Sequence, residues 1–425
     1  KDMDYRIIPP DGYIEGHFSL PLSKSMSNRA FIISALTADA TLPDIPAECD
    51  DTIAMQKALT QGGDTVDVGA AGTAMRFLTA HYASQPGVTV TLDGSERMRQ
   101  RPIGPLVDAL RQLGADIEYA GEEGYPPLRI AGTRLSGGEI ALDATVSSQY
   151  VSALLMIAPT MEHGLKLKLE GEAVSTPYIK MTLQMMEAAG VEAERLPDAI
   201  IVEPGQAYTS PTLDVEPDWS AAAFAYEIQA IGAGETDIDG LQPESCQGDS
   251  RVSRIFEQLG VSTEWNDDSV RLTASPESSP RLTLDMSDTP DLVPAVVVTC
   301  CMLGIPFHLT GLETLRIKEC DRVGALMREM LKCGLILSAE APGVLTWEGQ
   351  RRPMEELPVF DTYDDHRMAM ALAPVAIFLP GIVIRDAEVV AKSFPDYWRQ
   401  LESMGFRLLD PDTPLDNPGE EDAEA

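Results

Sequence analysis

Hydrophobic and polar positions along the chain repeat a simple pattern, in which an amphipathic helical run ends at a glycine and a short alternating strand follows. Six copies occur, in KALTQGGDTVDV, ALRQLGADIEY, QMMEAAGVEAE, IFEQLGVSTEW, EMLKCGLILSAE and QLESMGFRLL. Glycine suits the position after a helix because it adopts a positive φ without a Cβ clash. The glycines are Gly63, Gly114, Gly190, Gly260, Gly334 and Gly405, and the last four intervals are 76, 70, 74 and 71 residues. Such near-regular spacing over the whole chain predicts a repeated α/β unit.

Short β-branched runs bounded by glycine or proline lie between the helical segments, as is typical of strands. They cover residues 88–92, 165–169, 236–238, 281–284, 307–309 and 382–384. With 425 residues, 44% of them hydrophobic, the chain exceeds what one core holds, and we expect two or more globular domains. No apolar run approaches the roughly 20 residues that span a bilayer.

The charge balance is strongly acidic, with a formal net charge of −35 at pH 7. Nucleic acids and anionic membranes bind through lysine and arginine patches, so neither is expected as a partner. Part of the excess lies in residues 410–425, which hold seven acidic residues and no basic one and are predicted to be a disordered tail. An anionic substrate would need cations gathered locally.

Cysteine and histidine usage points to neither a metal nor a disulfide framework. The six cysteines form no CxxC pair, and the five histidines form no HExxH motif. We therefore predict no metal site and a reducing, cytoplasmic location.

The stretch LPLSKSMSNR (20–29) concentrates polar and cationic side chains just before an apolar helical run. Polar caps followed by apolar positions at helical spacing indicate a helix start. Backbone N–H groups, the helix dipole, Lys24 and Arg29 would then converge on one point, with Ser25 beside them, which suits an anion. An ordinary capped helix explains the same stretch about as well.

Two further stretches could bind anions. In GSERMRQRPIG, Arg97, Arg99 and Arg101 alternate, and an extended backbone would project all three to one side. AAGTAMRFL (70–78) is a Gly-Thr turn at Gly72 and Thr73 that enters a helix, which is a weak signal. No GxxxxGK[ST] or GxGxxG motif occurs, so a nucleotide loop is not predicted.

Hydroxyl and amide side chains open two other helices. TVSSQY supplies Ser147, Ser148 and Gln149, and VSTPYI supplies Ser175. These groups could bind a polyhydroxylated ligand, although each set taken alone is better explained as a helix cap.

Carboxylates and cations also stand together at predicted element starts in the second half of the chain. The carboxylates are Asp291 and Glu319, and the cations are Lys318, Arg322, Arg367 and Lys392. Each of these stretches taken alone is explained equally by a helix start with charged residues beside it. Together they provide acid–base groups beside an anion clamp, which proton-coupled chemistry on a phosphorylated carboxylate requires.

Eight motifs in one order carry a family resemblance that spans residues 9–407. They are LPLSKSMSNR, AAGTAMR, RPIGPLVDALRQLGA, VSSQY, VSTPYI, KECDR, YDDHRMAMA and AKSFPDY. The chain resembles the 5-enolpyruvylshikimate-3-phosphate (EPSP) synthase family. That resemblance implies an α/β fold of two globular domains, each made of three βαβαββ units with helices packed inside, like an inside-out α/β barrel. The implied domains are 22–216 and 1–21 with 217–409, the acidic tail is 410–425, and the active site lies in the interdomain cleft.

The resemblance also implies a reaction, in which the 5-hydroxyl of shikimate 3-phosphate adds to C2 of phosphoenolpyruvate and phosphate then leaves. This is a step of the shikimate pathway of aromatic amino-acid biosynthesis and the target of glyphosate. No cofactor is implied, the partners are the two small-molecule substrates, and the chain is expected to be a monomer.

Matching the motifs position by position implies three sets of site residues. Those for phosphoenolpyruvate are Lys24, Gly72, Thr73, Arg101, Gln149, Arg322, Arg367 and Lys392. Those for shikimate 3-phosphate are Lys24, Ser25, Arg29, Ser147, Ser148, Gln149, Ser175, Asp291 and Lys318. The implied catalytic residues are Asp291 near the attacking hydroxyl, Glu319 near C3 and Lys24 at the leaving phosphate.

The chain departs from the family pattern at four positions. Leu22 replaces a glycine, Ala70 an asparagine, Phe77 a proline and Thr314 an asparagine. None of these changes removes a charge, so we expect activity with altered affinities, and a negative φ at Leu22 with a stiffer crossover. Gly72 is the small residue that the resemblance places under the phosphoenolpyruvate site, and it predicts sensitivity to glyphosate. A shift of the helix by the flanking Ala70 and Phe77 would change that sensitivity.

Two other functions would explain part of the sequence. The sister enolpyruvyl transferase that acts on UDP-N-acetylglucosamine usually carries a cysteine ahead of RPI, and residues 94–101 contain none. A degenerate binding protein should have lost Lys24, Asp291 or Glu319, and all three remain.

Overall fold

The amino-terminal half of the chain builds two four-stranded sheets around buried helices. The computed structural model describes residues 3–143, 145, 147–171, 175–209 and 213–413, and statements about structure concern these residues. One sheet has the order β3 (Thr65–Asp67), β4 (Thr89–Asp93), β6 (Leu128–Ala131), β5 (Asp116–Tyr119), and the other β7 (Gly138–Asp143), β8 (Leu165–Glu170), β10 (Ala199–Val202), β9 (Glu194–Arg195). The helices are α1 (Lys24–Ala35), α2 (Asp50–Gln61), α3 (Gly72–Ala83), α4 (Gly104–Gln112), α5 (Ser148–Ile157) and α6 (Thr176–Ala188).

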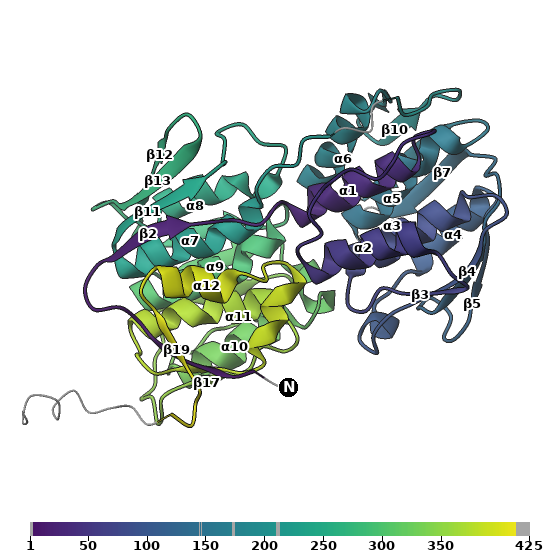
Figure 1. The fold of residues 1–425 in the computed structure, drawn as a ribbon. Helices are drawn as coiled ribbons and strands as arrows, with labels where there is room; N and C mark the ends of the chain where they lie inside the picture. Colours follow the sequence, from purple (N-terminus) through teal and green to yellow (C-terminus); the bar gives the residue numbers. More distant parts are fainter. Residues whose placement is uncertain (1–2, 144, 146, 172–174, 210–212, 414–425) are drawn as a thin grey trace, which may run out of the picture.

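The carboxy-terminal half contains three sheets and takes in the start of the chain. Their orders are β12 (Val261–Trp265), β13 (Ser269–Ala274), β11 (Gly234–Asp239), β2 (Ile14–Phe18); β14 (Leu282–Asp285), β15 (Phe307–Thr310), β16 (Leu345–Trp347); and β17 (Val359–Phe360), β18 (Val383–Ile384), β1 (Tyr5–Ile8), β19 (Arg407–Leu409). The helices are α7 (Trp219–Gly232), α8 (Val252–Glu257), α9 (Val293–Leu303), α10 (Arg322–Lys332), α11 (His366–Leu372) and α12 (Tyr397–Ser403). Strand β2 pairs in parallel with β11, and β1 pairs antiparallel with β18 and β19, so the purple start of the chain lies with the green and yellow lobe (Figure 1).

Helices occupy the centre of each half and sheets form its outside. Every residue of α3 and of α11 is buried, and α9 is apolar on nearly all sides. A helix that is hydrophobic all round must be buried. The strands, by contrast, alternate buried and exposed residues, as in β7, because one sheet face meets the helices and the other meets solvent. The predicted α/β class with inward helices is confirmed.

The sheet pattern is complete in the carboxy-terminal half and reduced in the amino-terminal half. The described residues of that half form no third sheet; instead α1 packs against α2, α3, α5 and α6, and the segments 36–49 and 203–209 are irregular. The repeat of helix, glycine and strand is otherwise as predicted. All six glycines have positive φ, between 77° and 130°. Five of them lead into strands, whereas the chain after Gly334 makes only isolated bridges, Leu335 with Arg351 and Ser338 with Thr346.

The six predicted strands are confirmed within one or two residues of their predicted ends, as β4, β8, β11, β14, β15 and β18. Among the described helices none has the length and apolar character to cross a bilayer. The described residues also contain no cluster of histidine, cysteine or acidic side chains suited to a metal. Residues 414–425 of the predicted acidic tail lie outside the described residues.

The two chain crossings between the halves pair with each other. Leu22 and Pro217 form an antiparallel bridge, flanked by hydrogen bonds from the Ser23 N–H to the Glu216 carbonyl at 2.8 Å and from the Asp218 N–H to the Pro21 carbonyl at 2.9 Å. Leu22 lies outside the left-handed region, as predicted, and packs its side chain on the amino-terminal core. The two crossings therefore run side by side and are joined by backbone hydrogen bonds.

Candidate active site

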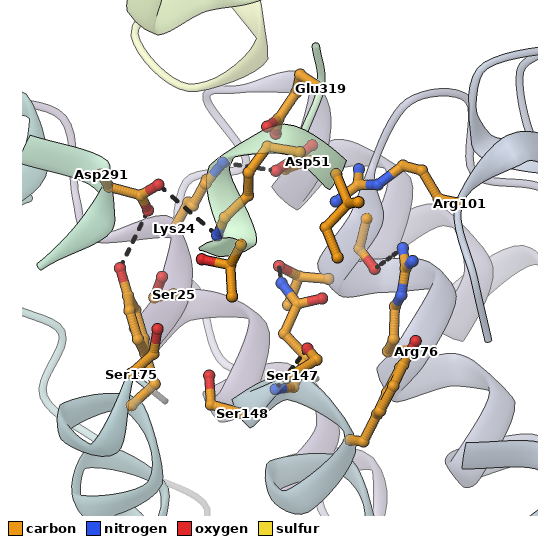
Figure 2. A pocket seen from close by; sticks show the side chains of 18 of the residues that line it. Lys24, Ser25, Asp51, Arg76, Arg101, Ser147, Ser148, Ser175, Asp291 and Glu319 are labelled. Atoms are coloured by element: carbon orange, nitrogen blue, oxygen red, sulfur yellow. Dashed lines mark hydrogen bonds and ion pairs between the residues drawn. The ribbon is translucent and has the colours of Figure 1, made fainter. Parts of the chain in front are cut away.

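A cavity between the two halves gathers the chemistry-bearing side chains (Figure 2). The amino-terminal half contributes Lys24, Ser25, Arg29, Asp51, Gly72, Thr73, Arg76, Arg101, Pro102, Ser147, Ser148, Gln149, Tyr150, Ser175 and Tyr178. The carboxy-terminal half contributes Asp291, Thr314, Ile317, Lys318, Glu319, Arg322 and Arg367. Every predicted site residue except Lys392 therefore lines one cavity.

Helix starts surround this cavity, which explains why the capping signals in the sequence marked it. The Ser147 hydroxyl accepts from the Gln149 N–H at 3.2 Å at the start of α5, and the Asp365 carboxylate accepts from the Arg367 N–H at 3.0 Å at the start of α11. Helices α1, α3 and α10 also begin at cavity residues. The positive ends of these helix dipoles thus add to the side-chain cations.

One buried arginine organises the carboxylates of the carboxy-terminal half. Arg322 is 1% exposed and donates to three acids: from Nη1 to Asp291 Oδ1 at 2.9 Å, from Nη2 to Glu319 Oε2 at 2.9 Å and from Nε to Asp365 Oδ2 at 2.7 Å. The guanidinium holds its five N–H donors in a rigid planar fork, so it can contact several carboxylates in a fixed geometry. Arg322 therefore fixes the spacing of Asp291 and Glu319.

The Asp291 carboxylate is held ionised. Burial alone would raise its pKa, but Arg367, Lys318 and Arg322 outweigh burial and hold the pKa well below its usual range. Arg367 Nη2 lies 3.2 Å from Asp291 Oδ2, and Lys318 Nζ lies 3.9 Å from Oδ1. An ionised, buried carboxylate in a cavity can accept a proton from a bound hydroxyl.

Glu319 is held in the same way by a different set of cations. Burial would raise its pKa, but Lys392, Arg322 and Arg101 outweigh it and hold the pKa well below the usual range. Lys392 Nζ lies 3.4 Å from Glu319 Oε1 and donates to the Ala70 carbonyl at 2.6 Å. Lys392 thus lines a neighbouring cavity, which shares Glu319 with the first cavity, and contacts the site through Glu319.

Lys24 is paired with an acid that sequence reasoning missed. Its Nζ lies 2.8 Å from Asp51 Oδ2, and both side chains are buried. Burial would lower the pKa of Lys24, but Asp51 outweighs it and raises the pKa, so the ammonium stays charged. The run of two acids at the start of α2 was a visible signal, but it resembles any helix start with acids in its first turn.

Arg29 lies in a slot between two aromatic rings. Its guanidinium carbon is 5.2 Å from the Phe77 ring centre and 5.9 Å from that of Tyr178. Its Nε donates to the Thr182 hydroxyl at 2.7 Å and its Nη1 to the Ser25 carbonyl at 2.8 Å. Burial lowers the pKa of Arg29 to about 10, which still leaves it charged at neutral pH. Phe77, where the family pattern has proline, thus contacts Arg29, a residue predicted to bind shikimate 3-phosphate.

The three alternating arginines do not project to one side, contrary to the sequence prediction. Residues Met98–Gln100 form a 3-10 turn (η1), so the two-residue period of an extended strand does not apply. Arg101 lines the cavity, Arg99 pairs with Asp93 at 2.6 Å on the outside, and Arg97 crosses to the other half.

Comparisons with known proteins identify the family. The model of EPSP synthase (3-phosphoshikimate 1-carboxyvinyltransferase) matches residues 56–401. A 3-phosphoshikimate 1-carboxyvinyltransferase from Bacteroides fragilis is 49% identical over 407 residues, covering 96% of this chain and 99% of that protein. The chain belongs to the EPSP synthase family. A relative of the same description from Shewanella pealeana is 35% identical, covering 93% of this chain and 98% of that one.

A solved EPSP synthase from Acinetobacter baumannii shares the fold, with a TM-score of 0.76 and 20% identity over 96% of this chain and 100% of that one. Besides Phe77, two departures from the EPSP synthase pattern touch the site: Ala70 offers its carbonyl to Lys392, and Thr314 lines the cavity.

Further cavity residues were not assigned roles from the sequence. Arg76 donates to the carbonyls of Gly72 at 3.1 Å and Pro102 at 3.0 Å, so it braces the turn at the start of α3. The Tyr178 hydroxyl donates to Asp291 Oδ2 at 3.2 Å. The sequence placed Arg76 at the Gly-Thr turn of AAGTAMRFL and Tyr178 in VSTPYI, but only the fold shows what they contact.

Proposed function

We propose that this chain transfers the enolpyruvyl group of phosphoenolpyruvate to the 5-hydroxyl of shikimate 3-phosphate and releases inorganic phosphate. The observation that carries the proposal is the pair Asp291 and Glu319, two largely buried carboxylates kept ionised on one guanidinium inside a cation-lined cavity between the halves. Two polyanionic substrates need many cations, and carboxylates retained among them serve acid–base steps. Membership of the EPSP synthase family supports the same assignment.

Shikimate 3-phosphate would lie against the starts of α5 and α6. Hydroxyls of Ser147, Ser148 and Ser175, the Gln149 amide and the N–H groups of the helix starts suit its ring hydroxyls and phosphate. Further contacts would come from Lys24, Ser25, Arg29, Lys318 and Asp291. Asp291 would accept the proton of the 5-hydroxyl as that oxygen bonds to C2 of phosphoenolpyruvate.

Phosphoenolpyruvate would lie on the side of Glu319, held by Arg101, Arg322, Arg367 and Lys392, with Gly72, Thr73 and Gln149 beside it. Of these cations Lys392, Arg322 and Arg101 lower the pKa of Glu319. When the phosphate and carboxylate of phosphoenolpyruvate pair with them, their effect on Glu319 is offset and its pKa rises. Glu319 can then carry a proton to C3 and take one back when phosphate leaves C2, while Lys24 stabilises the leaving phosphate.

We also propose that residues 22–216 and residues 1–21 with 217–409 are the two domains, with 410–425 as a solvated tail. Two separate hydrophobic cores support these bounds, one from Met26 to Leu213 and one that joins Ile7–Phe18 to Trp219–Phe406. Because one chain supplies both walls of the cavity, we propose that the protein acts as a monomer. We also propose that it acts in the cytoplasm on small molecules and uses neither a metal nor an organic cofactor.

Phosphate release from phosphoenolpyruvate tests the proposal directly. The chain should release phosphate with shikimate 3-phosphate as acceptor and not with UDP-N-acetylglucosamine in a parallel reaction. Release only with the nucleotide sugar would assign the sister activity. If shikimate 3-phosphate binds in a calorimetric titration but neither acceptor supports release, the chain is a non-catalytic binding protein.

A further inference from the structure

The side chain of Arg97 spans the cleft between the two halves. It leaves the loop before α4 in the amino-terminal half and donates from Nε to the Glu319 carbonyl at 3.1 Å and from Nη2 to the Lys318 carbonyl at 3.2 Å. A guanidinium fork that holds two successive carbonyls fixes the direction of the chain as well as its position. Arg97 therefore clamps the backbone that carries two predicted site residues.

The clamped backbone has little other support. Residues 318–320 lie between the 3-10 turn η5 (Glu313–Ile317) and α10, outside any helix or strand. Among the described backbone groups no N–H donates to the carbonyl of Lys318 or of Glu319. Their side chains, by contrast, must stay within reach of Asp291 and Arg322. The carbonyl contacts of Arg97 supply the restraint that secondary structure does not.

The base of the clamp is rigid. The Ser95 N–H donates to the Gly69 carbonyl at 2.9 Å, and Met98 is 1% exposed in the amino-terminal core. Movement of the amino-terminal half therefore carries Arg97 with it.

We propose that Arg97 is a positioning residue that couples closure of the two halves to the placement of Lys318 and Glu319. The donor and its acceptors belong to different halves, so the contact forms only when the cleft is closed. Because Arg97 is largely exposed, water competes for its hydrogen bonds, and the clamp is weak enough to open in each turnover. The consequence for catalysis rests on the proposed transferase function, whereas the clamp itself does not.

Arg99 offers a matched control two residues away. It has the same charge and is also exposed, but its partner Asp93 lies in the same half. Arg97→Gln and Arg99→Gln therefore remove the same charge from the same loop, and only the first breaks a contact across the cleft. Arg97→Lys keeps the charge but lacks the rigid fork that holds the two successive carbonyls.

The first experiment is hydrogen–deuterium exchange on the full chain, which needs no substrate. Amides of residues 313–322 should exchange faster in Arg97→Gln than in the unchanged chain, whereas Arg99→Gln should leave them unchanged. Equal exchange in the two variants would overturn the clamp, whatever the chain catalyses.

The second experiment measures phosphate release with shikimate 3-phosphate. Arg97→Gln should lower kcat by about tenfold, the size expected for loss of hydrogen bonds from a charged donor. The dissociation constant for shikimate 3-phosphate alone should stay within about twofold, Arg97→Lys should recover part of kcat, and Arg99→Gln should behave as the unchanged chain. A kcat in Arg97→Gln equal to that of Arg99→Gln would refute the coupling. Absence of release by the unchanged chain would instead refute the transferase function.

Discussion

Replacing Arg322 by methionine should destabilise the carboxy-terminal half and reverse the dependence of its stability on pH. Arg322 neutralises a cluster in which Asp365 is fully buried and Asp291 and Glu319 are nearly so, at 15% and 12% side-chain exposure. In its absence Arg367 still faces Asp291 and Lys392 still faces Glu319. Asp365 keeps no guanidinium contact, so a buried charge is left uncompensated, which costs about 3–5 kcal/mol.

The sign of the pH dependence follows from the direction of the shifts. In the unchanged chain the pKa values of Asp291 and Glu319 are held well below their usual ranges, so their contribution to stability is present above about pH 4.5 and is lost as the pH falls through the lower, folded-state values. In the variant the cluster retains protons that the unfolded chain releases. The free energy of unfolding of the variant should therefore decrease as the pH rises from 5 to 7, by at most about 1.4 kcal/mol per pH unit for each retained proton.

Urea unfolding followed by tryptophan fluorescence isolates this half, because all four tryptophans lie in it: Trp219, Trp265, Trp347 and Trp398. Arg316→Met is the control, since Arg316 pairs with Asp321 at 3.1 Å on the surface and should contribute under about 1 kcal/mol. Adding Asp365→Asn to the Arg322 variant should restore part of the loss, because asparagine can still cap α11. A loss no larger than that of the control, or stability that does not change between pH 5 and 7, would refute the reasoning.

Three further predictions concern substrates. Glu319→Gln should bind both substrates in calorimetry yet lose at least about a hundredfold in kcat, and normal turnover would remove Glu319 from the proton transfer. A Cβ at Gly72 would lie 2.6 Å from Arg101 Nη1, so Gly72→Ala should raise KM for phosphoenolpyruvate and spare shikimate 3-phosphate affinity; equal effects on both would contradict a local cause. Phe77→Leu removes the ring beside Arg29 and should raise KM for shikimate 3-phosphate about threefold, with KM for phosphoenolpyruvate as the internal reference.

Local sequence rules predicted much of the architecture and most of the cavity lining. Glycines after amphipathic runs predicted the six helix ends, because a left-handed residue is a local requirement. Capping side chains at Ser147 and Asp365 marked helix starts for the same local reason, and the helix starts converge on the cavity. The motif order then pointed to EPSP synthase, which the relatives confirm.

Tertiary structure alone decided which charges meet. Arg322 contacts Asp291, 31 residues away, and Asp365, 43 residues away, and no periodicity links such positions. The pairing of Lys24 with Asp51 and the slot of Arg29 depend likewise on how helices pack. The arginines at 97, 99 and 101 show the limit most clearly. Their spacing predicted one face, but a 3-10 turn sends one to the cavity, one to the surface and one across the cleft, because side-chain direction follows backbone geometry, which packing around Met98 selects.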